Sequence, residues 1–171
     1  MTVRSEGKEL VITRVFQAPL ELVFQAWSEA EHLKRWWGPK GFEIHVAELD
    51  FRPGGFFHYR MQASDGTQMW GKFVYREIVA LEKIVWDNSF SDESGNIVRA
   101  PFSDLIPLEI RNSVVFSANQ GATTITLRSA PINASAEEIS FFEGMFDSML
   151  EGFGGTFDQL EQYLQHKDGA F

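Results

Sequence analysis

The middle of the chain alternates apolar and polar positions in short segments. Phe57, Tyr59 and Met61 alternate with polar residues at positions 58, 60 and 62, which is the period-two pattern of a strand with one buried face. Links of turn length, such as Arg52-Pro53-Gly54, separate these segments and favour an antiparallel meander. The pattern predicts about seven strands, at residues 9–16, 42–49, 55–62, 68–78, 83–90, 110–118 and 123–130.

Two short helices are expected after the first strand. The first begins at Pro19, and its apolar positions recur at helical spacing as far as Trp27. Ser28 and Glu31 resemble a capping box for the second helix, which Gly38 and the proline after it must end.

The last third of the chain has a longer helical pattern. Ser135 and Glu138 form a capping box at its start. The apolar stripe that follows predicts one continuous helix of about 30 residues. Glycines at 144, 152, 154 and 155 lie within it and indicate close packing on the sheet, a bend, or room for a guest molecule. The stripe consists of Ile139, Phe142, Phe146, Met149, Phe153, Phe157, Leu160 and Leu164.

Residues 91–109 are the one long connection without a periodic pattern. Loops longer than about 12–15 residues are usually functional or mobile, so this loop is a candidate lid. The chain shows no repeat, linker or shift in composition. We therefore predict a single domain over residues 1–171, with its core at about 9–165.

Composition narrows the classes of partner. With 15 Lys+Arg against 24 Asp+Glu, the net charge of −9 disfavours nucleic acid and anionic membrane surfaces. The absence of cysteine excludes disulfides, thiol catalysis and Cys-ligated zinc. No stretch approaches the roughly 18 apolar residues of a membrane span, and the N-terminus lacks the apolar run of a signal peptide. These features predict a cytoplasmic protein without membrane insertion.

Three motifs resemble those of one known family. They are Trp36-Trp37-Gly38-Pro39-Lys40-Gly41-Phe42, Glu48-Leu49-Asp50-Phe51-Arg52-Pro53-Gly54-Gly55 and Tyr75-Arg76-Glu77-Ile78. Together with the order of elements they resemble the family named for the activator of heat-shock protein 90 ATPase, in the START-like superfamily (SRPBCC) of polyketide cyclases, lipid-transfer proteins and birch-pollen-type allergens. The resemblance covers the chain from about Leu10 to Leu164. It implies an α+β helix-grip fold, in which a curved antiparallel sheet surrounds a long C-terminal helix.

The resemblance leaves several functions open, because this superfamily hosts carriers, enzymes and binding modules on one scaffold. We expect non-catalytic binding of a small hydrophobic or aromatic molecule in a cavity between sheet and helix. One alternative is a co-chaperone-like regulator of a heat-shock protein 90 ATPase, acting in the stress response. Such activators carry an additional N-terminal domain, whereas only a few residues precede Glu9 here, so a chaperone partner is not expected. The other alternative is a cyclase- or hydrolase-type enzyme. The sequence leaves open whether the protein forms a homodimer.

The binding hypothesis depends on one apolar set of residues. Its members share strand faces or lie near the helical stripe: Phe57, Tyr59, Met61, Trp86, Asn88, Phe90, Met145, Met149 and Phe153. If they face one space, they supply the ring-lined wall of a small-molecule pocket. The other interpretation is a filled core, and the sequence leaves both open. Asn88 implies a partner or a guest, because a buried unpaired amide costs about 1–3 kcal/mol.

Two further groups of aromatic residues leave alternatives. Trp36 and Trp37 are expected either to anchor the second short helix or to line the cavity mouth. The facing of Trp70, Phe73 and Tyr75 is undecided, because both faces of their strand are apolar. Related chains often have tryptophan ahead of the final helical stretch, where this chain has phenylalanine at 153, and this departure leaves the local cavity shape open.

No catalytic residue, metal or cofactor is predicted. The four histidines at 32, 45, 58 and 166 lack metal-ligand spacing, and the chain has no nucleophile elbow around a serine. An enzyme acting in the cavity would need a general acid or base on its wall. His45, His58 and Asp87 are the residues to test for that role, although their spacing does not bring them together.

Overall fold

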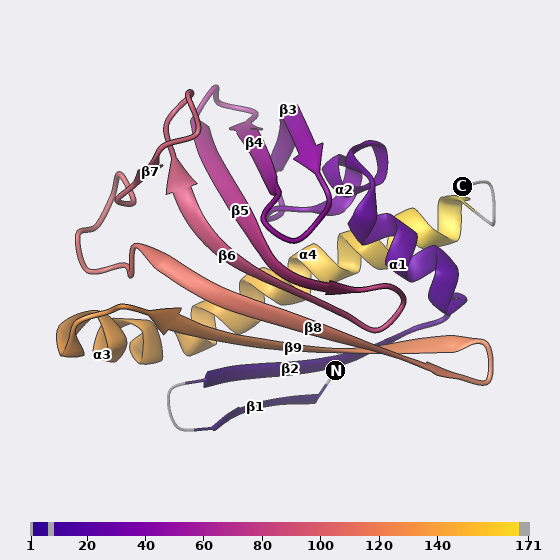
Figure 1. Cartoon of the computed structure of the whole chain (residues 1–171). Helices are drawn as coiled ribbons and strands as arrows, with labels where there is room; N and C mark the ends of the chain where they lie inside the picture. Colours follow the sequence, from indigo (N-terminus) through magenta and orange to yellow (C-terminus); the bar gives the residue numbers. More distant parts are fainter. Residues whose placement is uncertain (1, 7–8, 168–171) are drawn as a thin grey trace.

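The computed structural model describes residues 2–6 and 9–167, and its strands form a curved antiparallel sheet with the long helix α4 on one face (Figure 1). The strands are β1 (Thr2–Glu6), β2 (Glu9–Phe16), β3 (Phe42–Asp50), β4 (Phe56–Ala63), β5 (Gln68–Val79), β6 (Lys83–Ser91), β7 (Ile97–Val98), β8 (Glu109–Asn119) and β9 (Ala122–Ile132). The helices are α1 (Leu20–Ser28), α2 (Ala30–Trp36), α3 (Ala136–Gly144) and α4 (Phe146–Lys167).

The strand order is β1-β2-β9-β8-β6-β5-β4-β3, with β7 paired to β6 off this path. The predicted meander and the α+β helix-grip architecture are confirmed. Nine strands are present among the described residues where about seven were expected. The two additional strands are β1, which pairs with β2, and β7, which lies inside the connection expected to be irregular.

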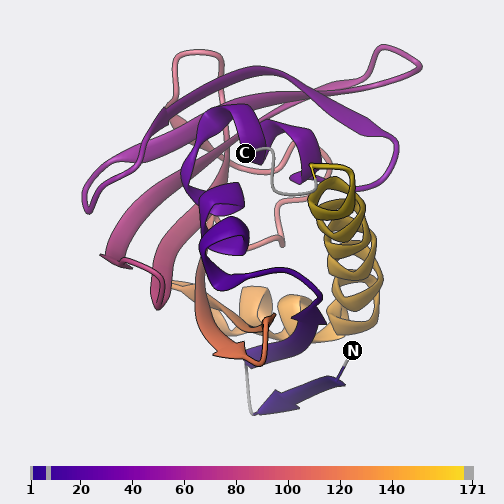
Figure 2. The same cartoon turned by 90° about the vertical axis from the view of Figure 1, so that its right-hand side faces the viewer.

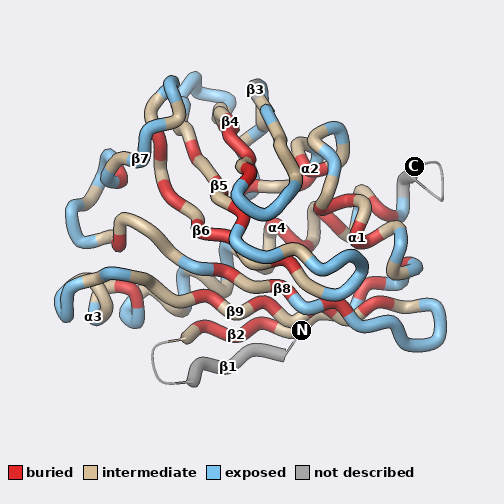
Figure 3. Tube along the Cα trace, in the orientation of Figure 1, coloured by how far each residue is buried: buried red, intermediate tan, exposed pale blue. Residues whose placement is uncertain are grey.

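The core lies between the concave face of the sheet and α4. Alternate residues of β8 and β9 are buried, as the red bands along these strands show (Figure 3). β2 contributes Leu10, Ile12 and Phe16 to the same core. On α4 the buried positions Phe157, Leu160 and Leu164 are spaced three and four apart, so they form one stripe toward the sheet. The ring of Phe16 on β2 meets that of Phe157 edge-on at 6.1 Å. Burial of this stripe is what attaches the helix to the sheet.

The helices α1 and α2 lie beside α4 at one end of the sheet (Figure 2). Trp36, at the end of α2, is 1% exposed, and its indole Nε1 donates to the Ala26 carbonyl of α1 at 3.0 Å. Its ring also packs on Trp27 with centroids 4.7 Å apart. Trp36 therefore joins the two short helices to each other.

Two details of the helix prediction are wrong and one is confirmed. The C-terminal stripe is not one continuous helix, because Met145 leaves the helical conformation at φ −94° and ψ 1° between α3 and α4. The apolar spacing continues across this break, so periodicity alone conceals it. Ser28 ends α1 instead of capping α2, whose N-terminal residue Glu29 makes no side-chain cap. The capping box of Ser135 with Glu138 is present.

The register of β5 settles how its aromatic residues face. Phe73 and Tyr75 are each 1% exposed and belong to the core. Trp70 lies an odd number of residues from both, so its ring projects to the convex face, where it stacks on His58 at 5.0 Å. Within residues 2–6 and 9–167, no helix has the length and apolarity to cross a membrane.

Candidate functional site

A cavity of about 240 Å³ lies between α4 and strands β4, β5 and β6. Its lining comes from three places: the sheet strands β4, β5 and β6, the segment after α2, and the first half of α4. The exposed Pro39 and Gly152 belong to this lining and mark its opening to solvent. The lining residues are Trp37, Gly38, Pro39, Tyr59, Met61, Trp70, Gly71, Asn88, Ser89, Phe90, Met149, Gly152, Phe153 and Thr156.

The sheet wall is built around the ring of Tyr59. This ring lies directly over Gly71 of the neighbouring strand, where an added Cβ would be 2.4 Å from the Tyr59 Oη. On its other side Tyr59 stacks on Phe57 with ring centroids 4.7 Å apart. Gly71 is paired with Phe90 in the next strand, so the hydroxyl of Tyr59 reaches across β5 toward β6. The missing side chain at position 71 is therefore what lets a tyrosine cover two strands.

Burial changes the chemistry of Tyr59. Its side chain is 3% exposed, and desolvation raises the pKa of its phenol to about 12, only partly offset by a hydrogen bond with Trp37. The indole N–H of Trp37 is the donor in that bond, since indole cannot accept. Tyr59 therefore stays neutral at physiological pH, and its own O–H donates to none of the described residues.

Asn88 supplies an unsatisfied polar group to the same wall. It alternates with Trp86 and Phe90 on β6 and lines the cavity. Its carboxamide oxygen Oδ1 is buried and has no hydrogen-bond partner among the described residues. A buried acceptor without a donor costs about 1–3 kcal/mol. The wall thus holds an unpaired acceptor in a mostly apolar surface.

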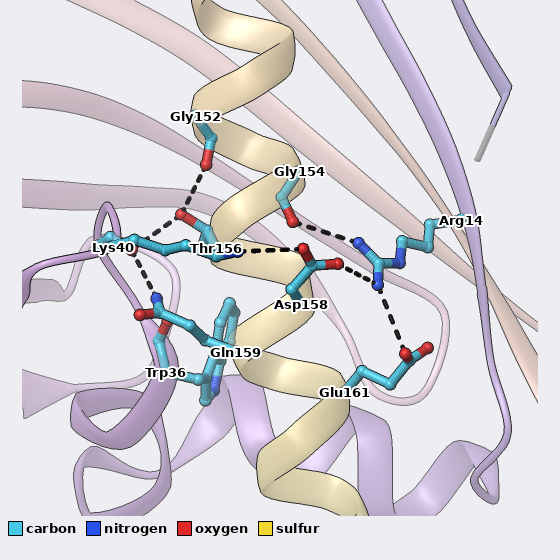
Figure 4. A network of polar contacts seen from close by, with 10 residues as sticks. Arg14, Trp36, Lys40, Gly152, Gly154, Thr156, Asp158, Gln159 and Glu161 are labelled. Carbon is cyan, nitrogen blue, oxygen red and sulfur yellow. Dashed lines mark hydrogen bonds and ion pairs between the residues drawn. The ribbon is translucent and has the colours of Figure 1, made fainter.

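The helix wall is held in place by four residues that we call the α4 clasp: Trp36, Gly38, Thr156 and Gln159. Gln159 Nε2 donates to the carbonyls of Trp36 at 3.1 Å and Gly38 at 2.9 Å, and Thr156 Oγ1 donates to Gly38 O at 2.9 Å (Figure 4). Gly38 has φ +105°, a conformation that favours glycine. The α4 clasp fixes the distance between the helix and the segment after α2.

An ion-pair cluster holds the same helix from both sides (Figure 4). Arg14 of β2 donates to Asp158 at 2.7 Å and lies 3.6 Å from Glu161, while Lys40 reaches Asp158 at 3.4 Å (Figure 4). The hydrogen bond from Arg14 is the main reason that the pKa of Asp158 lies below its usual value. Arg14 also donates to the Gly154 carbonyl at 3.3 Å. α4 is therefore fixed along the stretch that borders the cavity.

The structure brings together most, but not all, of the residues expected in one cavity. Tyr59, Met61, Asn88, Phe90, Met149, Phe153 and Trp37 line it. Phe57 and Trp86 are fully buried in the core and are not among the lining residues. Met145 lies elsewhere, in an open depression shared with Leu105 and Phe141. Trp36 does not line the cavity either.

Several lining residues were not expected from the sequence, namely Gly38, Pro39, Trp70, Gly71, Ser89, Gly152 and Thr156. The sequence could have indicated Gly71, since a glycine inside a strand often marks the close approach of another group. Gly152 had been identified only as one of several helical glycines. The sequence carried no signal for Thr156, because a threonine on a helix does not reveal to which carbonyl its hydroxyl donates.

The connection between β6 and β8 contacts the cavity wall at Phe90, which pairs with Val98 of β7. Phe102 is 65% exposed and packs edge-on against Phe90 with centroids 5.6 Å apart. The same connection is joined to α3 by an ion pair of Arg99 with Glu138. Its role as a lid stays a prediction.

The acid–base residues considered for an enzyme lie away from the cavity. His58 stacks on Trp70 and makes a 3.1 Å hydrogen bond with the Asp92 carbonyl. Asp87, 2% exposed, points to the face opposite Trp86 and Asn88 and accepts hydrogen bonds from Arg76 at 2.7 Å and Arg111 at 2.8 Å. Burial alone would raise the pKa of Asp87, but the two arginines outweigh it and the pKa is lowered.

His45 does not meet His58 across the sheet. It sits at the irregularity of β3 between Ile44 and Val46, and the cross-strand partner of His58 is Glu48. No group of three histidine, aspartate or glutamate side chains in the described part of the chain is arranged to hold a metal ion.

A family model described as Activator of Hsp90 ATPase homolog 1-like protein matches residues 17–165. The chain belongs to this family. The match includes every residue that lines the cavity. It also confirms the resemblance inferred from the sequence motifs. No curated protein matches the chain.

Solved structures share the fold of this Hsp90 ATPase activator-like chain over nearly its whole length. Protein Ms6760 from Mycobacterium smegmatis is 26% identical with a TM-score of 0.76, and the match covers 95% of this chain and 94% of that one. A protein from Arthrobacter aurescens is 25% identical with a TM-score of 0.79, covering 96% and 91%. Protein NE0264 from Nitrosomonas europaea, at 24% identity, a TM-score of 0.74 and coverage of 97% and 99%, is similar in fold alone.

Proposed function

We propose that the protein binds a small hydrophobic or aromatic molecule, without catalysis, in the cavity between the sheet and α4. The observation that carries this proposal is an apolar, ring-lined cavity that contains an unpaired buried acceptor, Asn88 Oδ1. Small-molecule sites combine a mostly apolar lining with a few placed polar groups. A guest that donates to Asn88 would remove a cost that the free protein bears.

The chemistry of the lining supports binding rather than turnover. None of the lining side chains is an aspartate, glutamate, histidine, lysine or arginine. The one ionisable group on the wall is Tyr59, whose pKa is raised to about 12 by burial. A general acid or base works best with a pKa near the operating pH, so this wall is poorly suited to proton transfer.

The direct test is thermal unfolding in the presence of small hydrophobic compounds of graded size. At a ligand concentration 100 times the dissociation constant, the stabilisation is about 2.7 kcal/mol. For a chain of this size, that corresponds to a rise in Tm of roughly 5–10 °C. The measurement is differential scanning calorimetry, with isothermal titration to confirm stoichiometry.

A cavity-blocking variant makes the test specific. An added Cβ at Gly152 would meet nothing within 4 Å, and helical side chains lean toward the preceding turn, here toward Met149 and the cavity. Gly152→Phe should therefore fold normally and lose ligand binding by at least tenfold. Gly152→Ala is the control, since it also replaces glycine with a better helix former but adds no ring, and it should bind like the wild type. Equal binding by both variants, or no stabilisation by any compound, would overturn the proposal.

A further inference from the structure

The size of the cavity limits what it can hold, and this inference rests on the proposed binding function. A closed apolar cavity of about 150 Å³ accommodates benzene. By proportion, a cavity of about 240 Å³ takes roughly ten non-hydrogen atoms. That corresponds to a substituted single ring or two small fused rings. Sterols and long-chain fatty acids are too large for this space.

The charge of the lining limits the ligand further. No cationic or anionic side chain of the described residues contributes to the cavity wall. A charged ligand would therefore lose its hydration without gaining an ion pair. The ligand must be neutral where it lies within the cavity.

Two polar groups on the wall complement each other. Asn88 Oδ1 is a buried acceptor without a donor, and the Tyr59 O–H donates to no residue in the described part of the chain. The Tyr59 hydroxyl lies over Gly71, which is paired with Phe90. Residues 88 and 90 share a strand face about 7 Å apart. A group that both donates and accepts is therefore matched to this part of the wall.

A hydroxyl is the smallest substituent with both capacities. We propose that the cavity binds a neutral aromatic alcohol of one ring or two small fused rings, whose hydroxyl donates to Asn88 Oδ1 and accepts from the Tyr59 hydroxyl. The flat ring packs among Trp37, Phe90 and Phe153, and the softer Met149 adjusts to its substituents.

Three probes of similar size test this assignment by isothermal titration: p-cresol, its methyl ether 4-methylanisole, and toluene. We expect p-cresol to bind at least fivefold more tightly than 4-methylanisole, since the ether cannot donate to Asn88 and leaves Oδ1 unpaired. Asn88→Leu, which keeps the branched shape and the number of heavy atoms but removes the amide, should abolish this preference while toluene still binds. Tyr59→Phe removes only the hydroxyl, so it should weaken p-cresol and leave toluene unchanged.

The outcomes separate this inference from the proposed function. Equal affinity of p-cresol and 4-methylanisole, with binding lost in Gly152→Phe, would overturn the hydroxyl assignment and leave the binding function intact. Binding of palmitate or cholesterol, but of none of the three probes, would overturn both the size limit and the aromatic-alcohol assignment, and would leave the binding function intact. No binding by any compound would overturn the proposed function itself. Thermal melts of Asn88→Leu and Tyr59→Phe establish that both variants are folded.

Discussion

The close contact between Gly71 and the Tyr59 ring predicts that even alanine at position 71 will destabilise the protein. This residue does not have a positive φ, so alanine can adopt its backbone conformation without strain. The obstacle is steric, because an alanine Cβ would lie 2.4 Å from Tyr59 Oη, 2.5 Å from Cζ and 2.8 Å from Cε2. Ordinary contact needs about 3.5–4.0 Å, so the ring must move by roughly 1 Å or more.

The surroundings of Tyr59 determine the magnitude. Its ring stacks on Phe57 at 4.7 Å and meets Phe73 edge-on at 5.8 Å, so it can move only by disturbing these rings or by entering the cavity. Overpacking of this kind costs typically about 1–3 kcal/mol. For a chain of this length each kcal/mol lowers Tm by roughly 2–4 °C. Gly71→Ala should therefore reduce Tm by about 2–12 °C.

A double-mutant cycle assigns the loss to this one contact. Tyr59→Leu removes the ring, so in that background Gly71→Ala should be neutral or mildly stabilising, because alanine restricts the unfolded chain more than glycine does. The coupling energy between the two positions should then be about 1–3 kcal/mol. The assay is urea unfolding followed by circular dichroism. A Gly71→Ala protein with the wild-type Tm, or a coupling energy near zero, would refute the described position of Tyr59.

Two further substitutions test the cavity and the convex face. Met149→Trp should stay within about 0.5 kcal/mol of wild-type stability in urea unfolding while weakening ligand binding, because Met149 borders open space; a loss of 1–3 kcal/mol would indicate a filled site. Asp87→Asn should destabilise the protein at pH 7, and the difference from wild type should shrink below about pH 4, since the pKa of Asp87 is lowered in the folded state and its stabilisation disappears as the carboxylate is protonated. A constant difference between pH 7 and pH 3 would contradict this.

The sequence predicted the sheet and the short helices because their signals are local. Alternation in β4 and the turn residues between strands required no knowledge of distant parts of the chain. The break at Met145 was missed because the apolar residues on either side, Phe142 and Phe146, keep helical spacing and still meet edge-on at 5.5 Å. Periodicity reports which side of a helix is buried, not whether its axis is continuous.

The cavity was predicted less well because it depends on distance rather than on pattern. Phe57 and Tyr59 share one strand face, yet only Tyr59 lines the cavity. The difference arises from Gly71, which lets the Tyr59 ring lie across β5, whereas Phe57 lies opposite Phe73. The alternation of apolar and polar residues assigns each residue to a face of the sheet. It does not show which residues on that face pack against other side chains and which line a cavity.

The gap itself follows from how α4 is fixed. On the scale of about 24 cal/mol per Å³, an empty enclosed cavity of about 240 Å³ would cost roughly 6 kcal/mol, comparable to the whole stability of many domains. The helix cannot close this space without breaking the α4 clasp, whose carbonyl acceptors are then left without donors. The opening beside Gly152 admits water instead, but an apolar wall offers that water few partners. If the proposed function is correct, the fold itself maintains an unfilled apolar space, and the ligand gains binding free energy by displacing water from that space.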